Sequence, residues 1–169
     1  LAKQMIDQAK EAGADAVKFQ TFCAERLAIE KTPKVDYQLG TTDAGESHLQ
    51  MLRDLELSAD DHRVLFDYCH QIEIEFISTP YDQEAVDLLE SLGVKRYKVA
   101  SADIVDLPLI GHIANTGKPV LLSTGMATLD EIERAIDCLS PLDRDQITLL
   151  HCVSNYPCSD QSLNLRVLQ

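Results

Sequence analysis

The stretch Val120-Leu121-Leu122-Ser123-Thr124 decides the fold, because an apolar strand ends there in a polar pair and a helix follows. The same layout recurs at Ala16-Val17-Lys18-Phe19-Gln20, Phe76-Ile77-Ser78-Thr79-Pro80, Tyr97-Lys98-Val99-Ala100-Ser101 and Leu149-Leu150-His151-Cys152-Val153-Ser154. Ligands bind at the carboxyl ends of the strands in parallel α/β proteins. We therefore expect five strands to direct Lys, Gln, Thr, Ser and His side chains at one rim, suited to a small, polar, anionic ligand.

The composition is that of one globular domain: 169 residues, 45% of them hydrophobic and 25% charged. The net charge of −13 argues against nucleic acid and anionic membrane surfaces as partners. The longest apolar runs, 119–122 and 147–150, are far too short to span a bilayer, and the charged segment 1–12 is unlike a signal peptide. Five scattered cysteines without a CxxC pair predict reduced thiols in a cytoplasmic protein and no zinc site of the usual spacing.

Strands and helices are predicted to alternate along the chain. Apolar runs predict strands at 16–20, 73–78, 96–100, 119–123 and 146–152. Helical spacing predicts helices at 1–12, 47–55, 58–71, 82–92, 108–115 and 128–139. Ser58 is expected to be an N-cap, and Thr128 and Glu131 a capping box. Residues 21–46 are expected to form a long polar loop with a turn from Gly40 to Gly45.

This alternation predicts an α/β fold with a parallel sheet. No Gly-rich GxGxxG turn follows any strand, which argues against a dinucleotide-binding sheet. We therefore expect an incomplete (β/α)8 TIM barrel with about five of the eight strands. The chain opens inside a predicted helix and stops just after a predicted strand, so we expect it to be a piece of a larger barrel.

Two lysines are expected on the inner face of the barrel. Side chains alternate along a strand, so Lys18 and Gln20 should point inward opposite Phe19, and Lys98 should point inward opposite Val99. A lysine inside a barrel needs an anionic partner. One interpretation is an ion pair with a nearby Asp or Glu. The other, favoured by two such lysines beside several hydroxyls, is a phosphate or carboxylate ligand.

Several strand ends carry hydroxyl groups. The side chains of Ser101, Ser123, Thr124 and Ser154 can donate hydrogen bonds to phosphate oxygens, although each alone also fits a helix cap or a turn. Their recurrence at equivalent strand ends favours a ligand. His151 is a candidate metal ligand or general base, but no second His or carboxylate lies at a metal-like spacing. A hydrogen-bonded supporting role is therefore favoured for His151.

Taken together, these motifs resemble the sialic acid synthase family. The resemblance covers almost the whole chain and rests on the runs 17–21, 56–58, 76–82, 97–103, 116–126 and 150–157. It implies condensation of phosphoenolpyruvate with an N-acetylated amino sugar, either N-acetylmannosamine or 2,4-diacetamido-2,4,6-trideoxymannose, to give a nonulosonic (sialic-type) acid and phosphate. It also implies a divalent metal cofactor, Mn²⁺ or Mg²⁺.

The resemblance assigns roles to individual positions. The implied phosphoenolpyruvate contacts are Lys18, Thr79, Lys98, Ser101, Ser123 and Ser154, and the implied sugar contacts are Gln20, Asp103 and Tyr156. Some family members have Glu at position 103 and Asn at position 154. The stretch 31–52 resembles synthases for N-acetylneuraminic or diacetyllegionaminic acid more than the pseudaminic acid enzymes.

Other parts of the family's machinery are expected outside this chain. The resemblance implies a catalytic glutamate upstream of Leu1, two histidine metal ligands beyond Gln169, and a C-terminal antifreeze-like domain. Residues 1–169 would then be the central part of the synthase barrel, inactive and poorly folded alone. The full-length protein would be a homodimer acting on small-molecule substrates. Two alternatives stay open: another phosphate-binding barrel aldolase with Lys98 or Lys18 as a Schiff-base nucleophile, and a non-catalytic truncated barrel.

Overall fold

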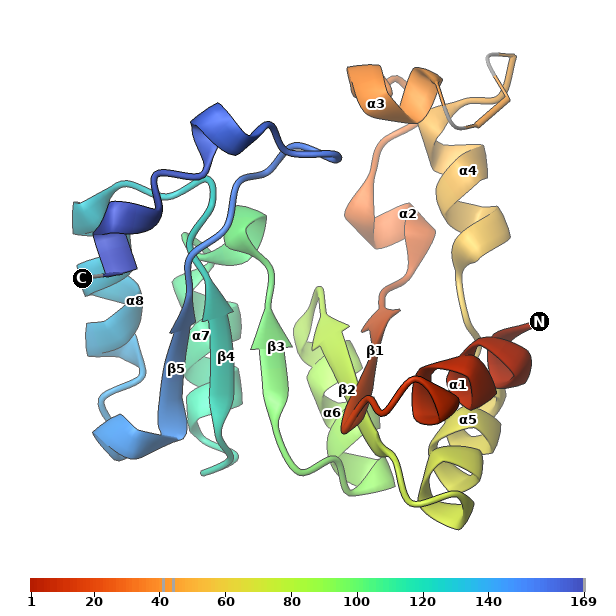
Figure 1. Ribbon diagram of the computed structural model, residues 1–169, viewed down its shortest axis with the longest axis horizontal. Coiled ribbons are helices and arrows are strands. Elements are labelled where there is room, and N and C mark those ends of the chain that lie inside the picture. The colour runs from red at the N-terminus through yellow and green to blue at the C-terminus, as the bar shows by residue number, and fades with distance from the viewer. Residues whose placement is uncertain (41, 44, 169) are drawn as a thin grey trace.

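The computed structural model describes residues 1–40, 42–43 and 45–168. Its five strands are all parallel and lie side by side in chain order (Figure 1). They are β1 (Ala16–Thr21), β2 (Glu75–Pro80), β3 (Tyr97–Val99), β4 (Val120–Ser123) and β5 (Ile147–Leu150). All five predicted strands are confirmed, with bounds that shift by one or two residues at eight of the ten ends.

Helices connect the strands. The α-helices are α1 (Ala2–Glu11), α2 (Ala24–Leu27), α3 (Asp36–Leu39), α4 (His48–Leu55), α5 (Ala59–Gln71), α6 (Gln83–Leu92), α7 (Leu107–Ala114) and α8 (Leu129–Cys138). Short 3₁₀ turns are η1 (Ser101–Asp103), η2 (Arg144–Gln146), η3 (Asp160–Ser162) and η4 (Leu165–Leu168). The six predicted helices are confirmed, and so are the N-caps Ser58 and Thr128, whose side chains accept from the backbone N–H groups of Asp61 and Glu131.

The predicted loop 21–46 contains two helical turns, α2 and α3, that the sequence analysis missed. The Glu56 carboxylate, 32 residues further along the chain, accepts the Ala24 backbone N–H at 2.8 Å and so satisfies a free donor at the start of α2. This capping partner is distant in sequence, which is why local patterns did not predict the turn. Thr41 and Ala44, in the predicted turn 40–45, lie outside the described residues.

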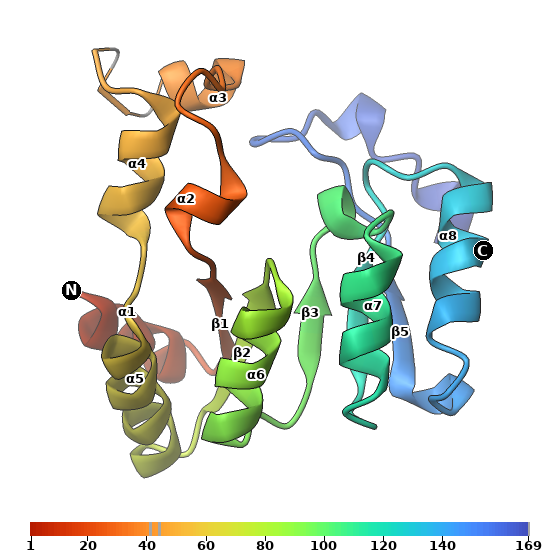
Figure 2. The same cartoon turned by 180° about the vertical axis from the view of Figure 1, so that it is seen from behind.

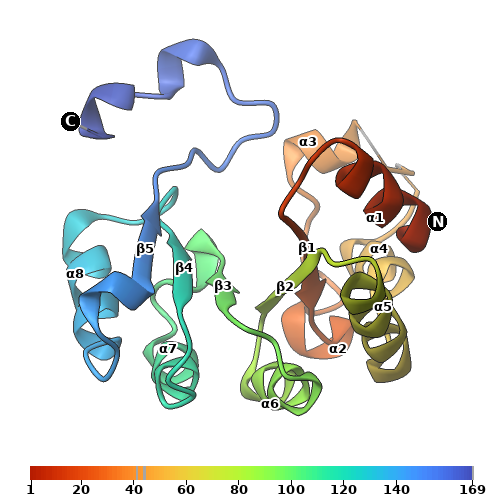
Figure 3. The ribbon, with the colours of Figure 1, turned by 60° about the horizontal axis from the view of Figure 1, so that its bottom comes forward.

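The sheet is curved, and helices α5 to α8 lie on one side of it (Figures 2 and 3). Figures 2 and 3 show α5, α6, α7 and α8 following the strands in an arc along one face. Helix α1 lies at the β1 end of the arc and contacts α5. Five parallel strands with outer helices in this order form an incomplete (β/α)8 barrel, as predicted.

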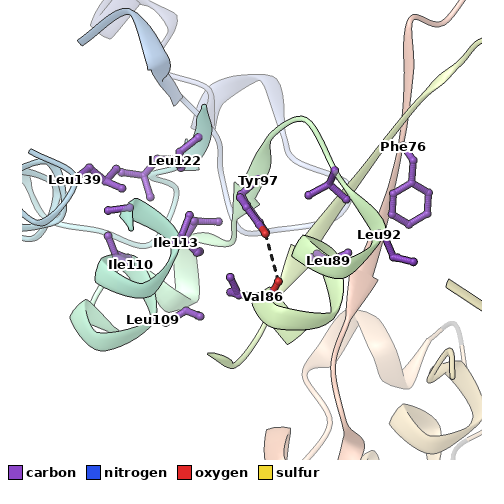
Figure 4. Close-up of a cluster of buried hydrophobic side chains, with 14 of the residues drawn as sticks. Phe76, Val86, Leu89, Leu92, Tyr97, Leu109, Ile110, Ile113, Leu122 and Leu139 are labelled. Carbon is purple, nitrogen blue, oxygen red and sulfur yellow. Dashed lines mark hydrogen bonds between the residues drawn. The ribbon is translucent and has the colours of Figure 1, made fainter. Parts of the chain in front are cut away.

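The hydrophobic core fills the space between the sheet and these outer helices (Figure 4). Tyr97 of β3 is fully buried there, and its hydroxyl donates to Glu90 Oε1 at 2.6 Å and lies 3.3 Å from the Val86 carbonyl. Val99 and Leu122 are also buried on this face. Because the apolar side chains point outward to the helices, the polar strand residues are left on the inner face.

Within the described ranges, no helix has the length and apolarity needed to cross a membrane.

Candidate active site

The strand register brings the predicted ligand contacts to one face of the sheet. Gln20 of β1 pairs with Thr79 of β2, and Lys98 of β3 pairs with Leu121 of β4, two residues before Ser123. Side chains alternate between the faces, so these residues lie opposite the core, as predicted. The strands also end at the same rim (Figure 1).

The two inner lysines form no salt bridge with a carboxylate in the described part of the chain. Lys18 is exposed on the open inner face and Lys98 is half-buried. Neighbouring protein atoms desolvate both ammonium groups and lower their pKa, and the positive charge of Lys18 lowers the pKa of Lys98 further, against smaller opposing effects of Cys152 and Asp103. Within the described residues the ion-pair interpretation finds no partner, and two neighbouring cations are left to attract an anion.

Hydroxyl groups lie at or just after the carboxyl ends of β2, β3, β4 and β5, at the rim toward which the two lysines' strands run. Ser101, in η1 after β3, and Ser154, after β5, have their Oγ atoms 3.2 Å apart. Thr79 Oγ1 is buried and has no hydrogen-bond partner among the described residues, and Ser123 is only 6% exposed. Buried hydroxyls normally have a partner, so the Thr79 hydroxyl, which strand alternation places on the inner face of β2, is a candidate donor to a ligand oxygen.

Thr124 belongs to the scaffold and does not have a free hydroxyl. Both its backbone N–H and its Oγ1 donate to the Leu150 carbonyl, each at 3.1 Å. The alternative that the sequence analysis kept open, a turn former, is what the structure shows. Thr124 thereby ties the end of β4 to the end of β5.

Asp103 carries a perturbed carboxyl group at the end of η1. Burial, with a smaller contribution from the negative charge of Asp106, raises its pKa to about 6, although the positive charge of Lys98 opposes the shift. Its Oδ2 atom is buried without a hydrogen-bond partner in the described part of the chain. The group is thus protonated for part of the population near neutral pH and lies within reach of the charge of Lys98.

We expect the Asp103 carboxyl to titrate near pH 6, which carboxyl ¹³C NMR would measure. Lys98→Met should move the midpoint higher and Asp106→Asn should move it lower, because these two charges act in opposite directions. An unfolded Asp has a pKa of about 3.9, so the folded state binds the proton more tightly and stability falls as pH rises between about 4 and 6. A midpoint near 4 in the parent protein would contradict this prediction.

The predicted sugar contacts come from different strands of the arc. Gln20 is at the end of β1, where its side-chain amide donates to the Tyr81 hydroxyl. Tyr156 follows β5, at the opposite end of the sheet, and is 67% exposed. Asp103 lies between them, after β3. Tyr81 was missed by the sequence analysis, although its place directly after the Ser-Thr-Pro strand end could have indicated it.

His151 has the supporting role that the sequence favoured. Its Nε2 atom donates to the Leu163 carbonyl at 2.7 Å, because a carbonyl oxygen can only accept. This hydrogen bond holds the chain after β5 against the segment that returns toward α8. His151 is thereby engaged with the backbone through its Nε2 atom.

The site residues do not fit a metal centre by themselves. Within the described ranges, one group gathers three possible ligands, namely Cys23, Glu25 and Glu56 around the start of α2. Glu25 is paired with Arg53 at 2.8 Å, and Glu56 caps α2. Among the described residues, the inner rim offers one carboxyl group, Asp103, beside lysine ammonium groups, hydroxyls and the Gln20 amide, and one carboxyl is fewer than a divalent cation normally requires.

Comparison with known proteins identifies the family. Residues 5–169 match the NeuB family. The N,N'-diacetyllegionaminic acid synthase of Campylobacter jejuni is 45% identical over 171 residues, covering 100% of this chain and 51% of the relative. The enzyme of the same name from Legionella pneumophila is 43% identical over 173 residues, covering 100% of this chain and 49% of the relative.

A solved structure agrees with the sequence relatives. The crystal structure of N-acetylneuraminic acid synthetase from Leptospira borgpetersenii, in complex with citrate, superposes with a TM-score of 0.82 at 30% identity, covering 100% of this chain and 54% of that chain. The chain belongs to the NeuB family. It spans about half the length of the curated relatives it matches.

Proposed function

We propose that the complete protein condenses phosphoenolpyruvate with an N-acetylated amino sugar to form a nonulosonic acid and phosphate. The observation that carries the proposal is the pair Lys18 and Lys98, which forms no salt bridge among the described residues. The register of β2 and β3 places Thr79, whose hydroxyl has no partner among those residues, level with Lys98. Phosphoenolpyruvate carries a phosphate and a carboxylate. Two cations and several hydroxyl donors on one rim match this pair of anionic groups.

In this proposal, the lysines neutralise the anionic substrate. Lys18 and Lys98 bind its phosphate and carboxylate, and the hydroxyls of Thr79, Ser101, Ser123 and Ser154 donate to the remaining oxygens. The local cations also offset the net charge of −13, which otherwise repels an anion.

The proposed acceptor is the open-chain sugar. Gln20 and Tyr156 offer hydrogen bonds from two ends of the arc, and Asp103 offers a carboxyl with a pKa of about 6. A carbon–carbon bond forms between C3 of phosphoenolpyruvate and the aldehyde carbon. Water then adds at C2, and the tetrahedral intermediate collapses with cleavage of the C–O bond and release of phosphate.

The remaining family features are proposals about the complete protein. We assign the divalent metal, Mn²⁺ or Mg²⁺, and the catalytic glutamate to residues outside this chain, so no step above depends on them. We further propose a cytoplasmic homodimer. All five cysteines, each in the described part of the chain, are free, which supports a reducing compartment.

Phosphate release tests the proposal. The complete gene product, with added Mn²⁺, is incubated with phosphoenolpyruvate and either N-acetylmannosamine or 2,4-diacetamido-2,4,6-trideoxymannose. We expect phosphate release with one sugar and not with the other, and the sugar that supports release identifies the product. No release with either sugar, together with unchanged phosphoenolpyruvate binding by Lys98→Ala, would show that both the reaction and the site assignment are wrong. The 169-residue chain alone is expected to be inactive.

One observation favours a second candidate, a Schiff-base aldolase. Burial and a neighbouring cation lower the pKa of Lys98, and this combination activates lysine amines as nucleophiles. Borohydride with a ketone substrate would trap a covalent adduct on such a lysine, which mass spectrometry would locate. We expect no adduct, because the proposed role of Lys98 is to bind an anion as the ammonium ion.

A further inference from the structure

A buried chain of polar groups lies behind the rim, on the helix side of β1 and β2. The Thr21 hydroxyl lies 2.9 Å from His62 Nε2 and 2.7 Å from the Ser78 hydroxyl. His62 Nδ1 lies 2.9 Å from the Ser58 carbonyl. Thr21, His62 and Ser78 are 4%, 1% and 0% exposed, so they satisfy one another without solvent.

The donors and acceptors among these buried polar groups follow one order, from the Ser78 hydroxyl to the Ser58 carbonyl. A carbonyl oxygen only accepts, so His62 Nδ1 donates to Ser58, and in the uncharged ring Nε2 accepts the proton of the Thr21 hydroxyl. The Thr21 oxygen is then free to accept from the Ser78 hydroxyl. Removing one member leaves a buried polar group without a partner, and such a loss costs more than the bond itself contributes.

The buried polar groups Thr21 and Ser78 directly adjoin two of the proposed ligand contacts. Gln20 precedes Thr21 on β1, Thr79 follows Ser78 on β2, and Gln20 and Thr79 are partners in the strand register. Successive side chains point to opposite faces of a strand. The hydroxyls of Thr21 and Ser78 therefore hold the ends of β1 and β2 from the helix side. The side chains of Gln20 and Thr79 lie on the opposite, inner face of the same strand ends.

Local side-chain contacts do not fix Thr79 by themselves. Its Oγ1 atom has no hydrogen-bond partner in the described ranges, although the residue is 1% exposed. Its placement therefore depends on the backbone of β2, and that backbone is held from behind by the Ser78 hydroxyl. The Thr21 hydroxyl holds the adjacent end of β1 in the same way.

We propose that Thr21, His62 and Ser78 are positioning residues that fix the ends of β1 and β2, so that Gln20 meets the acceptor sugar and Thr79 meets phosphoenolpyruvate. The inference rests on the proposed function. Helix α5 provides the rigid support, since His62 is held on it through the Ser58 carbonyl at its N-terminus. Small displacements of substrate-positioning groups have large effects on turnover.

A matched pair of substitutions at Thr21 tests the proposal in the complete protein with Mn²⁺. Thr21→Val keeps the shape of the side chain and loses the hydroxyl, whereas Thr21→Ser keeps the hydroxyl. We expect Thr21→Val to raise the KM of the acceptor sugar and the Kd of phosphoenolpyruvate about tenfold. Thr21→Ser should restore both constants toward the parent values. Phosphate release gives KM and kcat, and calorimetry gives Kd without turnover.

Tyr68→Phe is the control for general destabilisation. It removes the hydrogen bond from Tyr68 of the same helix, α5, to Asp7 of α1, away from the rim. We expect it to lower the melting temperature and leave KM and Kd unchanged. The proposal is overturned if Thr21→Val lowers only the melting temperature, or if Tyr68→Phe raises the constants equally. A parent protein that neither turns over nor binds phosphoenolpyruvate would refute the proposed function, and this inference with it.

Discussion

Lys98→Met should abolish most phosphoenolpyruvate binding while leaving the fold intact. Removing one partner of a desolvated, hydrogen-bonded charge pair costs about 3 kcal/mol, or roughly 100-fold in affinity. Stability should stay the same or rise, because burial and the charge of Lys18 lower the pKa of Lys98 and so disfavour its charged form in the free protein. Calorimetric titration and thermal unfolding of the complete protein would measure both effects.

A loss of phosphoenolpyruvate affinity together with unchanged or higher stability distinguishes a lysine that binds a ligand from a lysine that stabilises the fold. Replacing a lysine that is held in an ion pair would lower the stability of the protein. We expect this for Lys118, whose Nζ lies 2.6 Å from Glu90 Oε1. Lys95→Met is the matched control, since this exposed lysine lies three residues earlier, before the amino end of β3. It should leave the affinity unchanged, and an equal loss in both variants would point to a general charge effect.

Gly125→Ala should damage both the fold and the site. A Cβ atom on Gly125 would lie 2.7 Å from the carbonyl oxygen of Cys152 and 2.9 Å from its Sγ. Backbone atoms must shift to accommodate the methyl group, at a cost of about 1–3 kcal/mol in unfolding free energy. Cys152 is two residues before Ser154, so we also expect phosphate release to fall at least about tenfold. Urea unfolding and steady-state kinetics would measure these changes.

The same substitution at another glycine provides the control. Gly111 lies inside α7, and its Cβ would meet Cys138 Sγ at 3.5 Å, an ordinary contact. Alanine is a better helix former than glycine by about 1 kcal/mol, so Gly111→Ala should stabilise the protein or leave it unchanged. If Gly125→Ala were as stable and active as Gly111→Ala, the close approach of the segments that follow β4 and β5 would not matter for the site.

Local patterns predicted most of the fold. The alternation of Lys18 with Phe19 and of Lys98 with Val99 placed cations inside and apolar groups outside, because strand side chains alternate with a period of two residues. The capping of α5 by Ser58 and of α8 by Thr128 involves residues only three positions apart. The turn α2 was missed because its cap, Glu56, is 32 residues away.

The sequence by itself determined the order of strands and helices, the face on which each strand carries its polar side chains, and the family. These properties follow from short-range periodicity and motifs. Only the tertiary structure decided which hydroxyls are free: Thr124 is bound to Leu150, whereas Thr79 has no partner among the described residues. It also decided the raised pKa of Asp103 and the role of His62, 41 residues from Thr21. Burial and hydrogen bonding of these groups arise from contacts between distant segments, which no local pattern of residues specifies.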